Sequence, residues 1–502
     1  MRDIHNVFRV MFVGLLLGAC VNIPLNAYVN EEAGTSRTLL GMDREANFSG
    51  AFIATSDVPW KISYECRRSF SWDDERAKKS AKKSNAVSGD GIWPTNSKWW
   101  KEYCDKLSYR NDKNFVALAL SGGGHRAAAF AAAVMFELQD AGVLKEVDVI
   151  SSVSGGSITA AYYALSCDQG EECLKTVEGT PRPVWSRKVI FDLLSHNLEL
   201  RWFGNWFWPD NIVRYWFTAF DRSDIMAETI ADNLYDTSFA GNEGFRFHDL
   251  NPRRPALILN ATDFTENTEV NLTTTRIGTG KEVGSDTDNL LKHLNFTFTV
   301  ETFSGDGGKK LCSDINLYPI SNAVMASSAF PAVFPFVTLR NYCLENSYIH
   351  LFDGGTSDNT GLLALKNLQD NFTGGGTPKR VIVIQVDASL GFTGKPKGDA
   401  DPRGMFDYIV DTNALDSVDT LMLSGNKMLQ DELDKKIACR VHIALRETVD
   451  DDRGKRLSKI GTRYKITTEQ IEDLKEAAKA LVRKKLPKFW HKGSFLESFE
   501  DC

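Results

Sequence analysis

Two short apolar segments, each followed at once by small residues and a helical segment, constrain the fold of this chain most strongly. Residues 115–120 (FVALAL) and 147–152 (VDVISS) have the length and apolar content of buried parallel strands. Three glycines and an alanine-rich helical segment at 126–139 follow the first strand, and a Ser-Gly-Gly sequence and a helical segment at 157–165 follow the second. This order predicts a strand–helix–strand unit of a parallel sheet with a right-handed crossover.

The rest of the chain continues this pattern. Further strands are expected at 256–261, 294–300, 380–386 and 441–445, and a C-terminal helix at 468–485. Strands that alternate with helices predict an α/β sheet covered on both faces. The chain has 502 residues, of which 42% are hydrophobic and 25% charged, so it can build a large core of this kind.

Ser154 lies between the second strand and its helix, as the nucleophile of a hydrolase elbow does. The turn is sharp and needs small neighbours, which Ser152, Gly155 and Gly156 provide. The usual pattern is GxSxG, and Ser152 replaces its first glycine. The helix dipole at such a position favours an alkoxide and the oxyanion that follows it. The alternative is that Ser154 only caps the helix.

The triple glycine Gly122-Gly123-Gly124 follows the first strand and opens its helix. Without Cβ atoms, this backbone can approach a ligand and direct N–H groups at an anion, which suits an oxyanion hole. The loop is not a nucleotide P-loop, because it lacks the GK[ST] sequence. It matches the dinucleotide pattern only loosely, with Ala127 at the third glycine position and Asp148 too early in the second strand. We therefore expect no cofactor.

Asp353 precedes Gly354 and Gly355, after a short and largely apolar run at 349–352. Asp followed by glycines is a common turn. The functional interpretation is that Asp353 is a general base for the serine.

These three segments together resemble the patatin-like phospholipase family. Its members carry GGGxR, GxSxG and DG[GA] motifs in this order, which correspond here to residues 122–126, 152–156 and 353–355. Residues 323–331 and 261–263 are also similar to family segments.

The resemblance implies a three-layer α/β/α sandwich with a mostly parallel central sheet, over residues 113–485. It also implies hydrolysis of fatty-acyl esters, as by phospholipase A or a lysophospholipase, through a Ser154–Asp353 dyad and an acyl-enzyme, without metal or cofactor. The amides of Gly122, Gly123 and Gly124 would bind the oxyanion. Supporting roles would fall to Arg126, which orients the glycine loop or pairs with a carboxylate, and to Gly155, Gly156, Gly354 and Gly355.

Two alternatives remain open from the sequence. A Ser-His-Asp esterase would use His442, which follows Asp353 in the required order, or His125 beside the glycine loop. A non-catalytic envelope lipoprotein could keep the same fold for binding or structure.

The N-terminus predicts export and lipid anchoring. Arg2 and Arg9 precede an apolar run at 10–19, which is too short to span a bilayer but suits a signal peptide. The run ends in Leu-Gly-Ala before Cys20, which resembles the lipobox of bacterial lipoproteins; the alternative is an ordinary secretory signal. We expect a signal peptide at 1–19, an extension at 20–112 after lipidated Cys20, and a tail at 486–502.

The resemblance to bacterial lipoproteins also predicts the compartment. No Asp follows Cys20, which favours the outer membrane of the cell envelope. The other eight cysteines are compatible with disulfides between neighbours in sequence, although their pairing stays open among 105 connectivities.

The partners expected are phospholipid or other acyl lipids and a membrane surface. An aromatic run at 201–220 is either core or a lipid-facing segment. Nucleic acid is not expected, because the net charge is −7 and the densest basic run, at 76–83, is short.

Overall fold

The computed structural model describes residues 114–486 except for 171–179, 236–243, 252–253, 266–294, 299–301, 303–310, 314, 332, 345–346, 371–379, 391–438, 449–451 and 459. The expected signal peptide, Cys20, the extension at 20–112 and the tail beyond residue 486 lie outside these residues.

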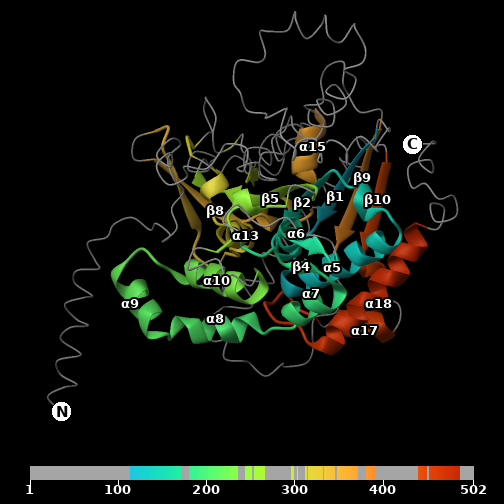
Figure 1. Cartoon of the computed structure of the whole chain (residues 1–502), viewed down its shortest axis with the longest axis horizontal. Coiled ribbons are helices and arrows are strands. Elements are labelled where there is room, and N and C mark those ends of the chain that lie inside the picture. The colour runs from blue at the N-terminus through green and yellow to red at the C-terminus, as the bar shows by residue number, and fades with distance from the viewer. Residues whose placement is uncertain are drawn as a thin grey trace, which may run out of the picture.

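A mostly parallel sheet forms the centre of this part of the chain (Figure 1). Its strand order is β10-β9-β1-β2-β5-β8-β7, with β6 beside β5. The first five strands are parallel, whereas β6 and β8 run antiparallel to β5, and β7 runs antiparallel to β8. The bounds are β1 Asn114–Leu120, β2 Val149–Val153, β5 Ala256–Asp263, β6 Asn295–Thr297, β7 Val337–Asn341, β8 Ser347–Asp353, β9 Arg380–Asp387 and β10 Cys439–Ala444.

The expected parallel α/β sheet is therefore confirmed. The strand expected at 294–300 is described only at 295–298, where β6 covers three residues and is antiparallel. Strands β7 and β8 were not predicted as such, because they alternate irregularly and lie partly exposed.

Helices cover the sheet on both faces. Helices α6 (Gly155–Leu165) and α13 (Ile320–Ser328) pack on β2, β5 and β8, and α5 (Gly124–Asp140) packs against α6 and α18 (Thr468–Lys485). Helix α15 (Leu362–Asp370) contacts β1 and β2 and lies on the opposite side of the sheet in Figure 1. Within α5, runs of buried alanines allow this close packing.

Helix α18 has the bounds that the sequence predicted, because its start is well capped. The Thr467 hydroxyl accepts a hydrogen bond from the Gln470 amide at 3.2 Å, and the Gln470 side chain accepts one from the Thr467 amide at 2.9 Å. None of the described helices is both long and apolar enough to cross a bilayer.

The aromatic run divides between core and surface. Helices α7 (Arg187–Leu194), α8 (Leu198–Trp206), α9 (Pro209–Phe217) and α10 (Arg222–Ile230) follow one another beside the sheet. Trp202 and Phe220 are buried, whereas Trp208 and Trp216 are exposed. No residue of α9 is buried. The core interpretation is therefore confirmed for Trp202 and Phe220, whereas the lipid-facing interpretation stays a prediction for the exposed residues.

One disulfide joins Cys312 to Cys343, with a Cα–Cα distance of 5.2 Å, as expected for neighbours in sequence. It ties the segment before α13 to the turn between β7 and β8. Cys167 and Cys439 are also disulfide-bonded.

Replacing both Cys312 and Cys343 by serine should lower the free energy of unfolding. The disulfide closes a loop of 31 residues, so the unfolded chain gains conformational entropy worth about 3–4 kcal/mol when it is removed. Urea unfolding followed by tryptophan fluorescence measures this loss. The single Cys343→Ser variant is the control and should lose as much. Unchanged stability in both variants would show that the disulfide does not constrain the unfolded chain.

Candidate active site

Ser154 occupies a strained turn between β2 and α6. Its φ of 50° and ψ of −123° are rare for a residue with a side chain. A Cβ on Gly155 would lie 1.9 Å from the Gly124 carbonyl oxygen, and one on Gly156 would lie 2.7 Å from the Ser121 carbonyl oxygen. Both positions thus require glycine, as the sequence pattern predicted, and the nucleophile position is locked at the start of α6.

Asp353 is the hydrogen-bond partner of the Ser154 side chain. The Ser154 hydroxyl donates to Asp353 Oδ2 at 2.8 Å, and both residues are buried. The other carboxylate oxygen accepts the Gly355 amide at 2.8 Å. The Asp353 carbonyl accepts the Thr262 hydroxyl at 2.9 Å. The serine and its carboxylate are therefore as close as a nucleophile and its base must be.

Three buried serines, linked by hydrogen bonds, support the backbone of Ser154. Ser327, on α13, accepts the Ser154 amide at 3.0 Å and donates to the Asn260 carbonyl at 2.6 Å. The Ser157 hydroxyl lies 2.9 Å from that of Ser327 and donates to Ser152 at 3.1 Å. Ser152, which departs from the usual glycine, therefore takes part in the support of the elbow. Ser327 lies 173 residues away from Ser154, within the segment 323–331 that resembles a family segment, but the resemblance assigned it no role.

The glycine loop approaches Ser154 closely. Gly123 and Gly124 have φ values of 133° and 59°, which favour glycine. A Cβ on Gly122 would lie 3.1 Å from Ser154 Cβ. No hydrogen bond is recorded for the Gly123 and Gly124 amides within the described residues, so these amides can serve an oxyanion.

The expected role of the Gly122 amide needs a correction. This amide donates to the Asn359 carbonyl at 3.0 Å, so it is not available to an oxyanion. The Asn359 side chain also fills the space beside Gly122, where a Cβ would meet its Oδ1 at 2.1 Å. Gly122 therefore serves close packing, and the sequence analysis missed Asn359. The turn-forming sequence Asp358-Asn359-Thr360-Gly361 was the available signal.

Arg126 orients the glycine loop, one of the two roles that the resemblance implied. Its Nη1 donates to the Ile460 carbonyl at 2.7 Å. The Arg463 carbonyl, three residues further on, accepts the His125 amide at 2.8 Å. The segment before α18 is thereby fixed against the start of α5.

Tyr464 belongs to the same segment and was also missed. Its hydroxyl donates to the Ser328 carbonyl at 2.8 Å, next to Ala329, whose carbonyl accepts the Asp353 amide at 3.0 Å. Burial, and then the charge of Asp353, raises the pKa of Tyr464, so the phenol stays protonated. Tyr464 therefore borders the Asp353 side of the site.

Neither candidate histidine pairs with Ser154. Both ring nitrogens of His125 are buried without a hydrogen-bond partner. Burial, with the nearby His196, lowers the pKa of His125 to about 4. His442 lies on β10, three strands away from β2, and its Nε2 is 3.3 Å from Oδ2 of Asp387. Burial alone would raise the pKa of Asp387, but contacts with His442, Ser389 and Arg446 hold it below its ordinary value.

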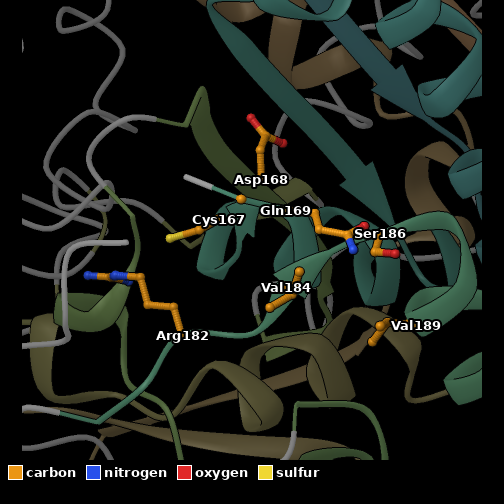
Figure 2. Close-up of a pocket in the computed structure, with 8 residues that line it drawn as sticks. Cys167, Asp168, Gln169, Arg182, Val184, Ser186 and Val189 are labelled. Carbon is orange, nitrogen blue, oxygen red and sulfur yellow. The ribbon is translucent and has the colours of Figure 1, made fainter. Parts of the chain in front are cut away.

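A separate cavity of about 300 Å³ lies beside the short strands β3 (Cys167–Asp168) and β4 (Val184–Trp185) (Figure 2). Arg182, Ser186 and Val189 are among its lining residues, and no predicted site residue is. Across the described ranges, no group of three His, Cys, Asp or Glu side chains could hold a metal ion.

Comparison with known protein families identifies the class of protein. Residues 118–366 match the family model described as "Patatin-like phospholipase". Residues 118–366, just under half of the 502-residue chain, therefore form a patatin-like phospholipase domain.

Comparison with solved structures gives distant similarities. Human GIVD cytosolic phospholipase A2 is 14% identical with a TM-score of 0.42, and the match covers 76% of this chain and 60% of that chain. The same enzyme in complex with methyl gamma-linolenyl fluorophosphonate and terbium chloride is 13% identical with a TM-score of 0.38, at 79% and 60% coverage. VipD from Legionella pneumophila is 13% identical with a TM-score of 0.30, at 75% and 67% coverage. No curated protein sequence matches this chain.

His125 should make folding stability depend on pH. Its pKa is about 4 in the folded protein, whereas the ordinary pKa of 6.5 applies to the unfolded chain. Between pH 4 and 6.5, therefore, the unfolded chain binds a proton at His125 that the folded chain does not. Stability should fall as pH drops through this window, by up to about 3 kcal/mol. His125→Phe keeps a ring beside Tyr464 and cannot titrate, so it should lack this part of the pH dependence.

Urea unfolding of both proteins between pH 7.5 and 4.5 measures the effect, because other titrating groups cancel in the difference. A stability difference that stays constant over this range would contradict the assignment.

Proposed function

We propose that the protein hydrolyses fatty-acyl esters of phospholipids or related acyl lipids, with Ser154 as nucleophile and Asp353 as general base. The observation that carries the proposal is the 2.8 Å hydrogen bond from the Ser154 hydroxyl to Asp353 Oδ2. It lies at a strained elbow in a patatin-like phospholipase domain. The Ser-His-Asp alternative has no comparable support, because His442 is paired with Asp387.

The first half of the reaction forms an acyl-enzyme. Asp353 Oδ2 takes the hydroxyl proton while Ser154 Oγ attacks the ester carbonyl carbon. The negative charge moves to the carbonyl oxygen, where the amides of Gly123 and Gly124 can stabilise it. When the tetrahedral intermediate collapses, the C–O bond to the alcohol breaks and Asp353 returns the proton to the leaving oxygen.

The second half regenerates the enzyme. Water enters, Asp353 takes one of its protons, and the hydroxide oxygen attacks the acyl carbon. Collapse then releases the fatty acid and returns the proton from Asp353 to Ser154.

A carboxylate is a weak base for a serine hydroxyl, so other contributions must lower the barrier. One oxyanion-hole donor is typically worth about 2.7–4 kcal/mol. Both Ser154 and Asp353 are buried, which strengthens electrostatic interactions between them and the amides. The strained backbone of Ser154 is held by Ser327 and two obligatory glycines, so the geometry exists before substrate binds.

Ser154→Ala and Asp353→Asn should each abolish most ester hydrolysis without unfolding the protein. Loss of the base alone is typically worth about 10²–10⁴-fold in turnover. The double variant should be little worse than either single one, because the two residues act as a unit. Fatty-acid release from phosphatidylcholine and lysophosphatidylcholine, and hydrolysis of soluble p-nitrophenyl butyrate, measure the effect.

His442→Ala is the matched control for this experiment and should retain substantial activity. Wild-type turnover in a folded Ser154→Ala protein would refute the nucleophile assignment. A folded wild-type protein that an active-site serine probe fails to label at Ser154 would favour the non-catalytic alternative.

We further propose that the protein is a lipoprotein of the bacterial cell envelope, anchored in the outer membrane through Cys20. The lipobox-like sequence before Cys20 and the absence of Asp after it support this. The disulfide between Cys312 and Cys343 supports export, since disulfides persist in oxidising compartments.

Cys20→Ser should release the protein from membranes or leave it unprocessed, because the anchor is covalent and depends on the thiol. Fractionation of expressing cells and mass spectrometry of the N-terminal peptide test this. The control replaces a different cysteine. Cys312→Ser should leave the amount of protein in the membrane fraction unchanged. A free, unacylated Cys20 in the membrane fraction would contradict the proposal.

A further inference from the structure

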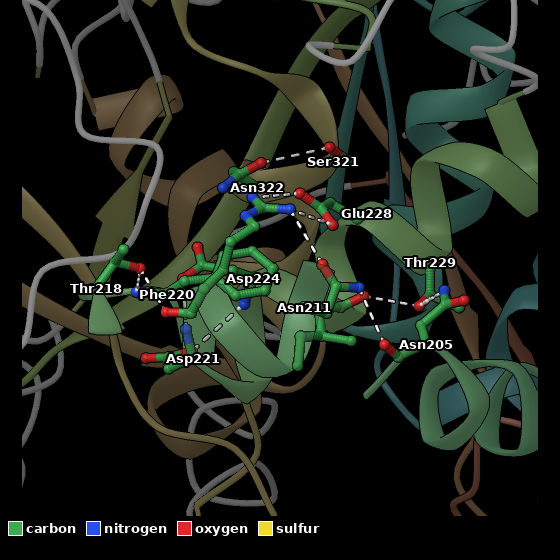
Figure 3. Close-up of polar contacts among 12 residues, drawn as sticks. Asn205, Asn211, Thr218, Phe220, Asp221, Asp224, Glu228, Thr229, Ser321 and Asn322 are labelled. Atoms are coloured by element: carbon green, nitrogen blue, oxygen red, sulfur yellow. Dashed lines mark hydrogen bonds and ion pairs between the residues drawn. The ribbon is translucent and has the colours of Figure 1, made fainter. Parts of the chain in front are cut away.

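Helix α9 turns Asn211 and Arg214 toward the protein and three of its apolar side chains toward solvent. Asn211 donates to the Asn205 carbonyl at 3.0 Å, and Arg214 donates to Glu228 on α10 at 2.8 Å (Figure 3). The Arg214 guanidinium also lies 3.7 Å from the centre of the Phe220 ring. The only arginine of α9 thereby contacts Glu228 on α10 and Phe220 in the turn before α10.

The opposite side of α9 is exposed and mostly apolar, with Asp210 one turn before Val213. Val213, Trp216 and Phe217 share this side at helical spacing, with 56%, 48% and 45% of their surface exposed. Phe207 and Trp208, in the turn between α8 and α9, are 60% and 64% exposed. We call these five residues the outer aromatic face. Helix α9, which carries three of them, lies at an outer corner of the described part of the chain in Figure 1. An apolar face of this kind marks an interaction site.

A row of aromatic rings in contact connects the outer aromatic face with Tyr464. Trp206 lies 6.4 Å from Phe207 and 5.6 Å from Trp202, measured between ring centres. Trp202 lies 5.4 Å from Phe334, which lies 5.7 Å from Tyr464. Tyr464 in turn borders the Asp353 side of the site, through the carbonyl of Ser328. Ring contacts therefore connect the exposed face with Tyr464, whose hydroxyl donates to the Ser328 carbonyl beside the site.

We infer that the outer aromatic face docks the protein on a lipid surface and so holds the proposed active site close to its acyl substrate. This inference rests on the proposed lipid hydrolase function. Tryptophan suits the boundary between headgroups and acyl chains, because its ring is apolar and its N–H can meet water or headgroups.

A second protein molecule fits this face less well. A stable protein interface involves about 20–30 residues a side, whereas this face has five apolar side chains. A fluid lipid surface needs no matching shape and no partner for each polar group. Asp210 is the only exposed acidic or basic side chain of α9, so binding to zwitterionic lipid should not depend on salt.

The test is cosedimentation with phosphatidylcholine vesicles. The full chain carries Cys20→Ser, so that no acyl anchor contributes, and Ser154→Ala, so that the lipid stays intact. Adding Trp208→Ala and Trp216→Ala should weaken vesicle partitioning by about tenfold or more, because two aromatic side chains no longer enter the interface. Raising the salt concentration should leave partitioning of the parent chain unchanged.

The matched control is Val189→Ala with Leu344→Ala, two apolar side chains that are 37% and 57% exposed outside the outer aromatic face. This control should bind vesicles as the parent does. In chains with Ser154 intact, the tryptophan variant should lose activity on vesicles but hydrolyse soluble p-nitrophenyl butyrate normally.

Three results would overturn the inference. They are unchanged partitioning of the tryptophan variant, an equal loss in the control, and a dimer in sedimentation equilibrium that the tryptophan variant abolishes. Failure to hydrolyse the soluble ester, with vesicle binding still dependent on Trp208 and Trp216, would instead reject the proposed function and keep the docking surface.

Discussion

The close contact between the starts of α5 and α6 is the constraint on which the rest of the site depends. Strands β1 and β2 are parallel neighbours, with Leu120 opposite Ser152, so their two helices must begin side by side. The Gly124 carbonyl then occupies the space where a Cβ of Gly155 would stand, at 1.9 Å. Only glycine permits this approach, and the approach brings the amides of the glycine loop beside the serine hydroxyl. The oxyanion donors and the nucleophile thus share one packing contact.

The reversal of strand direction at β8 brings the carboxylate to this contact. Val153, just before Ser154, is opposite Asn260 on β5, and the next β5 residue, Ala261, is opposite Asp353. The register therefore sets serine and aspartate at the same level of the sheet, with β5 between them. Ala261 is small, so the two side chains can meet above it. Gly354 then passes so close to the Asn260 carbonyl that a Cβ would lie 2.4 Å away, which explains the glycine after Asp353.

Sequence reasoning reached the parts of the site that local patterns encode. The strand–glycine–helix and strand–serine–helix segments have clear periodicity, so the sheet, α5, α6 and the elbow could be predicted. The roles of Ser327, Asn359 and Tyr464 could not, because each reaches the site from a distant segment and its local sequence does not indicate which group it contacts. The mistaken role of the Gly122 amide has the same origin, since its partner is the carbonyl of Asn359. Spacing in the sequence cannot show which amides of a glycine loop are already bonded.

The aromatic run shows why composition alone could not separate core from surface. Trp202 and Trp208 are six residues apart, yet one is buried and the other exposed, because α8 packs on Phe334 whereas α9 turns its arginine and asparagine inward. Two places depart from what local sequence predicts. Ser154 has a positive φ although it is not glycine, and α9 exposes apolar side chains to solvent. Such departures concentrate where function requires them. The proposed lipid hydrolase function accounts for both departures, because the elbow presents the serine and the outer aromatic face suits a lipid surface.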